Sequence, residues 1–306
     1  MVLTPSSIIN DLKVLETDGI KGPLFKDAVH GSIVQVTGDN LGIHGLFGFV
    51  ESFSARNCCR FCIIEKSEFQ TVFCEDDQSV ILRTKYMLAE HCHTVQTNPQ
   101  LPHVYGVKRS CLLNNLQYFN TADNLSVDFM HDILEGVAQL EVKLVLEYFQ
   151  ENLTAKKLTS RIESFNYGYT EKSNRPPAVK LLDGGNDLGL NAIQSWCLLR
   201  NMMFASVNVV AADSKYCVFS HPNNWHDHLS EAHHHHQLLK RLFRTRNLLS
   251  KHHFMIHYPR CIRNIGPLLH MWCMRYESKH NFFKTQLHPS IHYLPLLKVC
   301  NILVQS

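Results

Sequence analysis

The chain lacks an apolar run that could cross a membrane. Residues 196–219 come nearest, but Arg200, Asp213 and Lys215 interrupt them, whereas a spanning helix needs about 20 consecutive, mostly apolar residues. The first residues, MVLTPSSIIND, carry neither a basic start nor a long apolar centre, which argues against a secretory signal. We therefore expect an intracellular protein, nuclear or cytoplasmic, that is not secreted and has no membrane partner.

Strong charge and internal repeats are also missing. Charged residues make up 19% of the chain, and the formal net charge is only +3. A net charge this small neither requires nor excludes binding to nucleic acid, because acidic residues elsewhere can offset a basic patch on one face of the protein. The apolar share of 45% over 306 residues predicts a folded protein with one large domain or two modest ones.

The cysteines have no regular disulfide framework. There are 11 of them, an odd number with irregular spacing, which favours a reducing compartment with free or metal-bound thiols.

Apolar periodicity predicts an α/β protein that is mostly helical. The β-branched run at 32–37 predicts a strand, followed by a turn into a helix. Residues 150–190 contain Pro176, Pro177, Gly184 and Gly185 and are expected to be rich in loops. The predicted helices are 8–18, 123–149, 196–210, 233–250 and one that Pro267 opens.

A carboxylate directly follows the predicted strand. Asp39 opens the stretch GDNLGIHGLFGFVESFSARNCCRFC. The carboxyl end of a strand faces the crevice where α/β sheets bind ligands, and Mg²⁺ prefers carboxylate oxygens on rigid elements. The alternative is a turn aspartate, because Gly-Asp-Asn is itself a good turn sequence. An acid there, with a thiol pair soon after it, suggests a nucleic-acid enzyme or its remnant.

That thiol pair, Cys59 and Cys62, has the two-residue gap with which two thiolates bind one tetrahedral Zn²⁺ ion. No thioredoxin-like βαβ pattern surrounds it, so a metal site is favoured over a redox pair. Two buried, unligated thiols are the alternative, and Cys58 with Cys62 is a second register. The residues that could complete the site are His91, Cys92, His93 and Cys111.

Two further segments carry candidate acids. In VDFMHDILEGV, helical spacing puts Asp128, His131 and Glu135 on one face, which could orient a catalytic acid or bind a metal. The alternative is an ordinary amphipathic helix that Asp123 or Ser126 caps.

The second of these segments is HMWCMRYESKHNFF, where Glu277 lies among bulky apolar residues. A buried acid needs a partner or a metal. A salt bridge to Arg275 or Lys279 is the alternative. The histidine run at 233–236 points all around a helix, so we expect a solvated face there rather than one site.

Together these segments resemble the transposase-related proteins of EnSpm/CACTA-like DNA transposons, of the CMC superfamily. The motifs that carry the resemblance are GDNLGIHGLFGFVESFSARNCCRFC, VDFMHDILEGV and KHHFMIHYPRCIRNIGPLLHMWCMRYESKHNFF. They occur in the family's order, and the resemblance covers roughly residues 8–285.

The resemblance implies a partial RNase H-like core with a zinc-type module and a long helical insertion. Its parts would be 1–55 with the strand that carries the second aspartate, 56–118 as the zinc-type module, 119–250 as the insertion, and 251–306 as the return helix and tail. Asp39 would match the second acid of the Asp–Asp–Glu triad and Glu277 the last. Asp128 and His131 would match the D-x-x-H motif. Cys59 and Cys62 would match the zinc-type pair, with His91 as a partner.

The family's first catalytic aspartate has no match. It lies on the first core strand, whereas Asp11, Asp18 and Asp27 are not in strand-like sequence. We therefore expect a chain truncated at its N-terminus, as a fragment or a domesticated remnant, with an incomplete catalytic centre.

Three functions remain open at this point. The first is a DDE transposase-like protein, which would use Mg²⁺ if active, contain structural Zn²⁺ and bind DNA, with a homo-oligomer as a possible assembly. The second is a non-enzymatic, zinc-stabilised module that binds DNA or a protein, with Lys251, Arg260, Arg263 and Arg275 as phosphate contacts. The third is an unrelated metal-dependent hydrolase that uses the DFMHDILE face.

Overall fold

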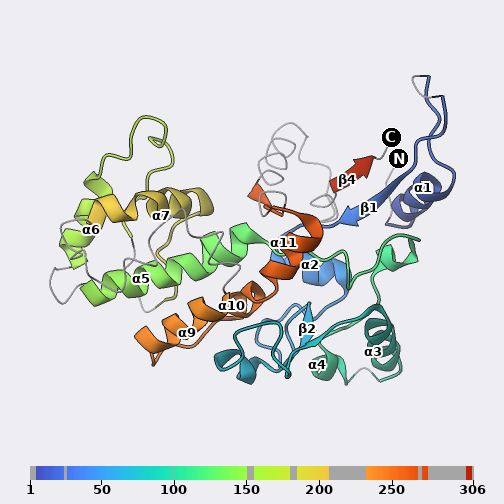
Figure 1. The fold of residues 1–306 in the computed structure, drawn as a ribbon, viewed down its shortest axis with the longest axis horizontal. Coiled ribbons are helices and arrows are strands. Elements are labelled where there is room, and N and C mark those ends of the chain that lie inside the picture. The colour runs from blue at the N-terminus through green and yellow to red at the C-terminus, as the bar shows by residue number, and fades with distance from the viewer. Residues whose placement is uncertain are drawn as a thin grey trace, which may run out of the picture. The chain divides into compact units, whose positions relative to one another are not determined.

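The structure is a computed structural model that describes residues 5–23, 26–98, 100–149, 155–179, 185–206, 232–267, 271–274 and 301–304. These residues are mostly helical and include a small antiparallel sheet, in agreement with the predicted mostly helical α/β class (Figure 1). The chain divides into two compact units. The first comprises residues 1–128 and 260–306, and the second comprises residues 129–259.

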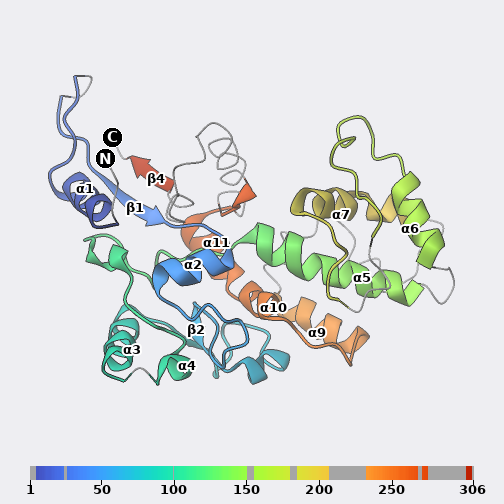
Figure 2. The same ribbon diagram turned by 180° about the vertical axis from the view of Figure 1, so that it is seen from behind.

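The sheet of the first unit contains the strand that the sequence predicts. Strand β1 (Gly31–Gln35) pairs antiparallel with β4 (Asn301–Val304), and the two strands lie side by side in both ribbon views (Figures 1 and 2). Ile33 is buried while Val34 is exposed, which is the alternation of a half-buried strand. Helix α1 (Pro5–Thr17) precedes β1, and helix α2 (Asn40–Phe47) follows it.

The cysteine-bearing segment of the first unit contains short elements. Strands β2 (Cys62–Ile63) and β3 (Ile81–Leu82) form a two-stranded antiparallel sheet. Phe49, Phe61 and Phe69 are buried in this unit. The remaining elements are the 3₁₀ helices η1 (Lys66–Gln70) and η2 (Leu112–Asn115) and the helices α3 (Lys85–Thr97) and α4 (Pro102–Tyr105).

The regular elements described in the second unit are all helices, and turns and loops connect them. The unit opens with the π-helix η3 (Met130–Val137), which continues as α5 (Ala138–Phe149). Helix α11 (Tyr258–Ile265) crosses the boundary between the units. The other helices are α6 (Ala155–Ser164), α7 (Ala192–Ser206), α9 (Ala232–Leu242) and α10 (Ser250–Met255).

In this region one predicted helix boundary is wrong, and the segment predicted to be loop-rich contains one helix besides its loops. The helix predicted from residue 123 begins only at Phe129. The residues before it run alongside the end of β1 instead, where Leu125 forms a parallel β-bridge with Val36. Helix α6 lies in the segment expected to be loop-rich. The proline and glycine pairs on which that expectation rested all follow α6 in the sequence.

The π-helix has a local cause. Glu135 leaves helical geometry, with φ −102° and ψ 17°, and Lys251 Nζ donates to its carbonyl oxygen at 3.0 Å. A Cβ on Gly136 would lie 2.3 Å from Lys251 Cδ. Glycine therefore lets the lysine reach a carbonyl that the regular helical hydrogen-bond ladder would otherwise occupy.

Most of the helix predicted from Pro267 lies outside the described residues. Within its described part, residues 271–273 form a bend and a turn.

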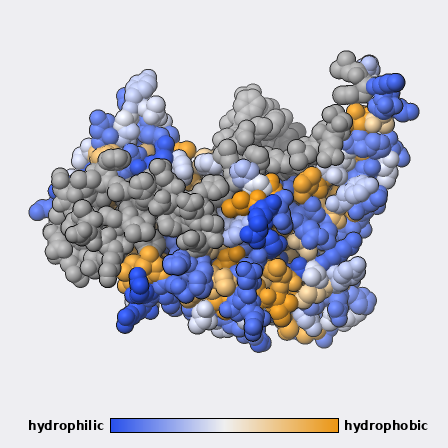
Figure 3. All heavy atoms as spheres, viewed as in Figure 1, coloured by the Kyte–Doolittle hydropathy of each residue, from blue (hydrophilic) through white to orange (hydrophobic). Residues whose placement is uncertain are grey.

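No helix in the described part of the chain is long and apolar enough to cross a membrane. Hydrophilic side chains cover much of the visible face, with small groups of hydrophobic ones between them (Figure 3).

Candidate metal centre and carboxylate edge

The end of β1 runs parallel to the segment that leads into Asp128. Val36 and Leu125 form a parallel bridge. Two side chains hold the segments together: Asn124 Nδ2 donates to Val34 O at 2.7 Å, and Ser126 Oγ donates to Val36 O at 3.1 Å. Both segments belong to the first unit.

This register brings two acids to the same edge. Asp39 comes three residues after Val36, and Asp128 comes three residues after Leu125. Because the two segments run parallel, both acids lie beyond the same end of them, the carboxyl end at which open α/β sheets bind ligands. Asp39 is half-buried and Asp128 is 1% exposed. We call Asp39 and Asp128 the carboxylate edge.

Asp39 also caps a helix. Its Oδ1 accepts the N–H of Gly42 at 2.6 Å, which makes Asp39 the N-cap of α2. The sequence left a ligand-binding acid and a turn aspartate as alternatives, and the structure shows the local role directly. The capping hydrogen bond fixes the rotamer of Asp39. Capping a helix and binding a cation are therefore compatible roles, because a cation site needs an oriented carboxylate.

The Cys59–Cys62 pair forms a tight, buried knuckle. Cys59 is 1% exposed and Cys62 is fully buried. Phe61 N lies 3.3 Å from Cys59 Sγ, within the range of an N–H···S hydrogen bond. Cys62 opens β2 opposite Leu82, and Arg83 N donates to Phe61 O at 2.9 Å. The main chain thus orients the thiols as a two-donor unit.

Burial disfavours the charged form of the Cys62 thiol. Burial raises the pKa of Cys62 well above its ordinary value, and the hydrogen bond and charge of Cys59 raise it further. Bound Zn²⁺ reverses this preference, because a coordinating thiol is deprotonated outright. The knuckle therefore fits a structural metal better than a reactive thiolate.

The structure does not bring the two predicted partners to the knuckle. In the described residues, neither His91 nor Cys111 joins Cys59 and Cys62 in a group of ligand atoms within 4.8 Å. The ring of His91 stacks on Tyr105 with centroids 4.2 Å apart.

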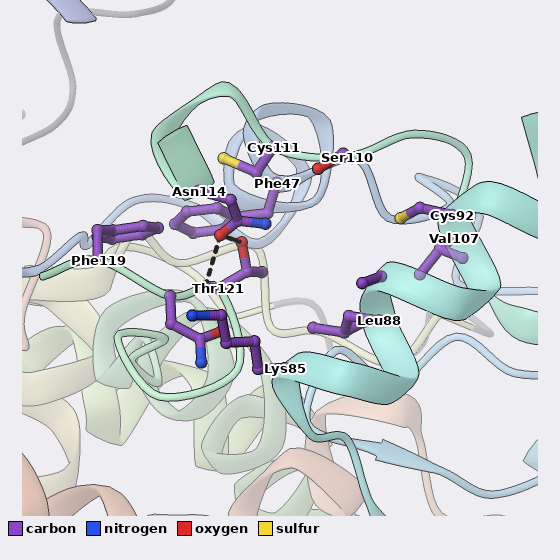
Figure 4. Close-up of a pocket in the computed structure, with 12 residues that line it drawn as sticks. Phe47, Lys85, Leu88, Cys92, Val107, Ser110, Cys111, Asn114, Phe119 and Thr121 are labelled. Carbon is purple, nitrogen blue, oxygen red and sulfur yellow. Dashed lines mark hydrogen bonds between the residues drawn. The ribbon is translucent and has the colours of Figure 1, made fainter. Parts of the chain in front are cut away.

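Cys111 has a different environment in the same unit. It lines a pocket of about 200 Å³ together with Cys92 (Figure 4). The rings of Phe47 and Phe119, which also line this pocket, are stacked with centroids 5.9 Å apart. The assignment of His91 and Cys111 as metal ligands therefore stays a prediction, because neither residue joins Cys59 and Cys62 in a ligand group of the described residues.

A histidine pair in the second unit was missed from the sequence. His253, in α10, and His257 are buried, at 1% and 0% exposure. Their ring centroids are 5.2 Å apart. The H-x-x-x-H spacing in KHHFMIHYP was the available signal, since it is a common second half of a zinc site. The described residues thus include buried Cys and His side chains able to hold a metal, which is compatible with structural zinc.

The D-x-x-H residues lie on either side of the unit boundary. Asp128 ends the first unit and directly precedes the helix that contains His131, so a helix face shared by the two stays a prediction. His131 and Glu135 do share a face of the π-helix, with Nε2 and Oε2 3.8 Å apart. Glu277 lies outside the described residues.

Half of the histidine run is buried, contrary to the expectation of a solvated face. His235 and His236 of α9 are 7% and 1% exposed. His235 Nε2 lies 3.0 Å from a carboxylate oxygen of Glu141, and His252 Nε2 lies 3.6 Å from the same oxygen. His236 Nε2 donates to His252 O at 2.8 Å. These four residues, the Glu141 cluster, link α5, α9 and α10.

No protein-family model, curated protein or solved structure matches the chain.

Proposed function

We propose that the chain is a transposon-derived, DDE transposase-like protein that acts on DNA through the carboxylate edge. One observation carries the proposal: Asp39 and Asp128 lie beyond the same end of two parallel segments. The resemblance to EnSpm/CACTA-like proteins supports it, because there an acid in the position of Asp39 belongs to a metal-binding triad on an RNase H-like core.

The residues of the edge suit a hard cation. Carboxylate oxygens on ordered backbone are the ligands that Mg²⁺ prefers, and the N-cap bond orients Asp39. When bound, Mg²⁺ supplies a Lewis acid for phosphoryl chemistry. The protein's own part is to hold the two carboxylates, with Glu277 as the proposed third acid.

We propose that the chain alone has an incomplete carboxylate set. Asp11 lies in α1, and neither Asp18 nor Asp27 lies on a strand. None of these three acids is therefore placed as the family's first aspartate is. Since electrostatic stabilisation at preorganised sites is commonly the largest part of catalysis, a missing acid should abolish most strand cleavage.

The test is cleavage of a labelled DNA duplex by the purified chain in Mg²⁺ or Mn²⁺. We expect no cleavage above that of the Asp39→Asn variant, which keeps the helix cap. Divalent-dependent cleavage that Asp39→Asn abolishes would overturn the incompleteness and support an active nuclease.

We further propose that the protein binds structural zinc through its buried Cys and His pairs. The Cys59–Cys62 pair of the first unit and the His253–His257 pair of the second unit each offer two donor atoms of the kind that zinc binds. Two double variants test this, Cys59→Ser with Cys62→Ser, and His253→Gln with His257→Gln. We expect each to lose the zinc that elemental analysis finds in the wild type. Full retention of zinc in both would contradict the assignment.

The second candidate function is a zinc-stabilised binding module without enzymatic activity. The buried knuckle favours it, but two of the cations expected to contact phosphate are engaged within the protein. Lys251 caps Glu135 O, and Arg260 Nε lies 2.9 Å from Glu75 Oε1. Arg263 is exposed. A mobility-shift titration at several salt concentrations decides, because phosphate binding weakens steeply with salt.

A further inference from the structure

Cys273 lies next to Asp128 inside the first unit. The structure places its Sγ within 4.8 Å of a carboxylate oxygen of Asp128. Both side chains are buried, at 3% and 1% exposure. In the sequence, Cys273 comes four residues before Glu277, the proposed third acid. Cys273 thus adds a sulfur donor beside one acid of the carboxylate edge.

Hydrogen bonds order the backbone that leads into Asp128. Ser126 Oγ donates to Val36 O at 3.1 Å. The thiol of Cys261, which is 2% exposed, makes a hydrogen bond with the main chain of Val127. The residues before Asp128 are therefore held both to the end of β1 and to the C-terminal part of the unit. A carboxylate on ordered backbone is a suitable ligand for a metal ion.

The spacing of this oxygen and this sulfur fits one metal ion. Zn²⁺ binds carboxylate oxygen at about 2.0–2.2 Å and thiolate sulfur at about 2.3 Å, so two such donors of one ion lie up to about 4.5 Å apart. The donor atoms also decide which ion is preferred. Carboxylate oxygens suit Mg²⁺ and Mn²⁺, whereas thiolates select softer ions such as Zn²⁺. A sulfur at the edge therefore shifts its preference away from Mg²⁺.

We propose that Cys273 is a metal ligand that, together with Asp128, makes the carboxylate edge selective for a thiophilic divalent cation over Mg²⁺. The inference rests on the proposed cation site and names the class of ion that it binds. As the metal–sulfur bond forms, the thiol releases its proton to water. Mg²⁺ gains little from the sulfur because it prefers oxygen ligands and retains several waters.

A purely structural contact makes a different prediction. A thiol is a weak hydrogen-bond donor and a carboxylate is an acceptor. If Cys273 only donates to Asp128, serine replaces it as the donor, and Cys273→Ser leaves metal binding unchanged. If Cys273 is a ligand, the same substitution removes a metal–sulfur bond. A spectroscopic signal of that bond separates the two roles.

The test is titration of Cd²⁺, a thiophilic ion, into the full chain, followed by the ultraviolet absorption of thiolate–Cd²⁺ bonds. The variants are Cys273→Ser, Cys273→Ala and Asp128→Asn. Cys261→Ser is the matched control, because Cys261 is a similarly buried thiol of the same unit that joins no ligand group among the described residues.

We expect Cys273→Ser and Asp128→Asn to lose the same part of the absorption and to weaken Cd²⁺ binding about 10-fold or more. That is at least what the loss of an outer-shell partner of a metal commonly costs. Cys261→Ser should change neither. Excess Mg²⁺ should leave Cd²⁺ on the wild type but displace it from the edge in Cys273→Ser.

Asp128→Asn is the decisive variant, because it leaves every thiol in place and decides the question even if neither Cys273 variant folds. An absorption that neither Asp128→Asn nor the Cys273 variants change overturns the inference. If Mn²⁺ still binds through Asp39 and Asp128 in that case, the proposed cation site stands and only the sulfur ligand is refuted. A wild type in which neither Cd²⁺ nor Mn²⁺ binding depends on Asp128 refutes the cation site and the inference together.

Discussion

Asp39 shows how one side chain can serve a helix and a site. Its Oδ1 satisfies an N–H at the start of α2, and its carboxylate belongs to the edge that Asp128 shares. Asparagine keeps the capping oxygen but loses the charge. The two roles can therefore be separated by substitution.

We predict that Asp39→Ala lowers the free energy of unfolding by about 1 kcal/mol, the usual value of an N-cap. Asp39→Asn should be nearly neutral. Urea denaturation of both variants measures the difference. Equal losses in the two variants would mean that charge, and not the cap, stabilises this turn.

Glu141 is a buried acid that its neighbours keep ionised. Burial by itself would raise its pKa, but the charge and hydrogen bond of His235 and the hydrogen bond of His252 lower the pKa to about 2. Burial also lowers the pKa values of His236 and His252. In this cluster the buried carboxylate is held by histidines rather than by arginine or lysine.

The cluster predicts an acid-sensitive second unit. His236 and His252 take up protons more readily when unfolded, so stability falls as the pH drops below their ordinary value of 6.5. The lowered pKa of Glu141 stabilises the folded state above pH 4.5, and this stabilisation is lost as the pH falls toward about 2. The protection of amide protons in α5 and α9 against exchange, corrected for the intrinsic pH dependence of the exchange reaction, should therefore fall on acidification from pH 7 to pH 5. Unchanged protection would contradict the proposed linkage.

Removing the carboxylate tests the same cluster at constant pH. We expect Glu141→Ala to cost about 3–5 kcal/mol, as when one partner of a buried ion pair is deleted. Glu141→Gln should cost less because the amide oxygen still accepts a hydrogen bond. Thermal unfolding measures both variants, and a loss near zero for Glu141→Ala would show that the pair contributes no net stability.

At the scale of elements, one glycine permits a close backbone approach beside the knuckle. Gly106 has φ +71°, and a Cβ there would lie 2.1 Å from Asn57 O and 2.8 Å from Arg83 Nη2. The turn after α4 therefore depends on a residue without a side chain.

A left-handed backbone conformation alone costs about 1–3 kcal/mol for a residue with a side chain. We predict that Gly106→Ala lowers the free energy of unfolding of the first unit by clearly more than this, because the added Cβ also clashes with Asn57 O. Gly168→Ala is the matched control, since Gly168 has φ +84° with nothing within 4 Å of an added Cβ. Denaturant unfolding compares them. Equal losses would mean that strain alone, without the clash, accounts for the effect.

Local patterns predicted some of the local elements. The β-branched run at 32–37 predicted the position of β1, and the apolar spacing at 8–18 predicted α1, whereas α3 was not predicted. The bridge between Val36 and Leu125 joins residues far apart in sequence, so no local pattern could reveal that Asp128 ends a strand-like segment instead of starting a helix.

At the scale of the whole molecule, the chain consists of two units with different chemistry. The first contains the carboxylate edge and the cysteine knuckle, and the second contains the Glu141 cluster and the His253–His257 pair. A DNA enzyme needs cation ligands on ordered backbone, and only the first unit shows two acids at the ends of parallel segments in the described residues. The central claim is therefore that Asp39 and Asp128 together bind a divalent cation.

Calorimetric titration of Mn²⁺ into the zinc-loaded full chain tests that claim most directly. We predict a Mn²⁺ site in the wild type that both Asp39→Asn and Asp128→Asn weaken by tenfold or more, about 1.4 kcal/mol each. Glu147→Gln is the control, because Glu147 pairs with Arg246 in the second unit. No Mn²⁺ binding by the wild type, or binding that neither aspartate variant changes, would contradict the account.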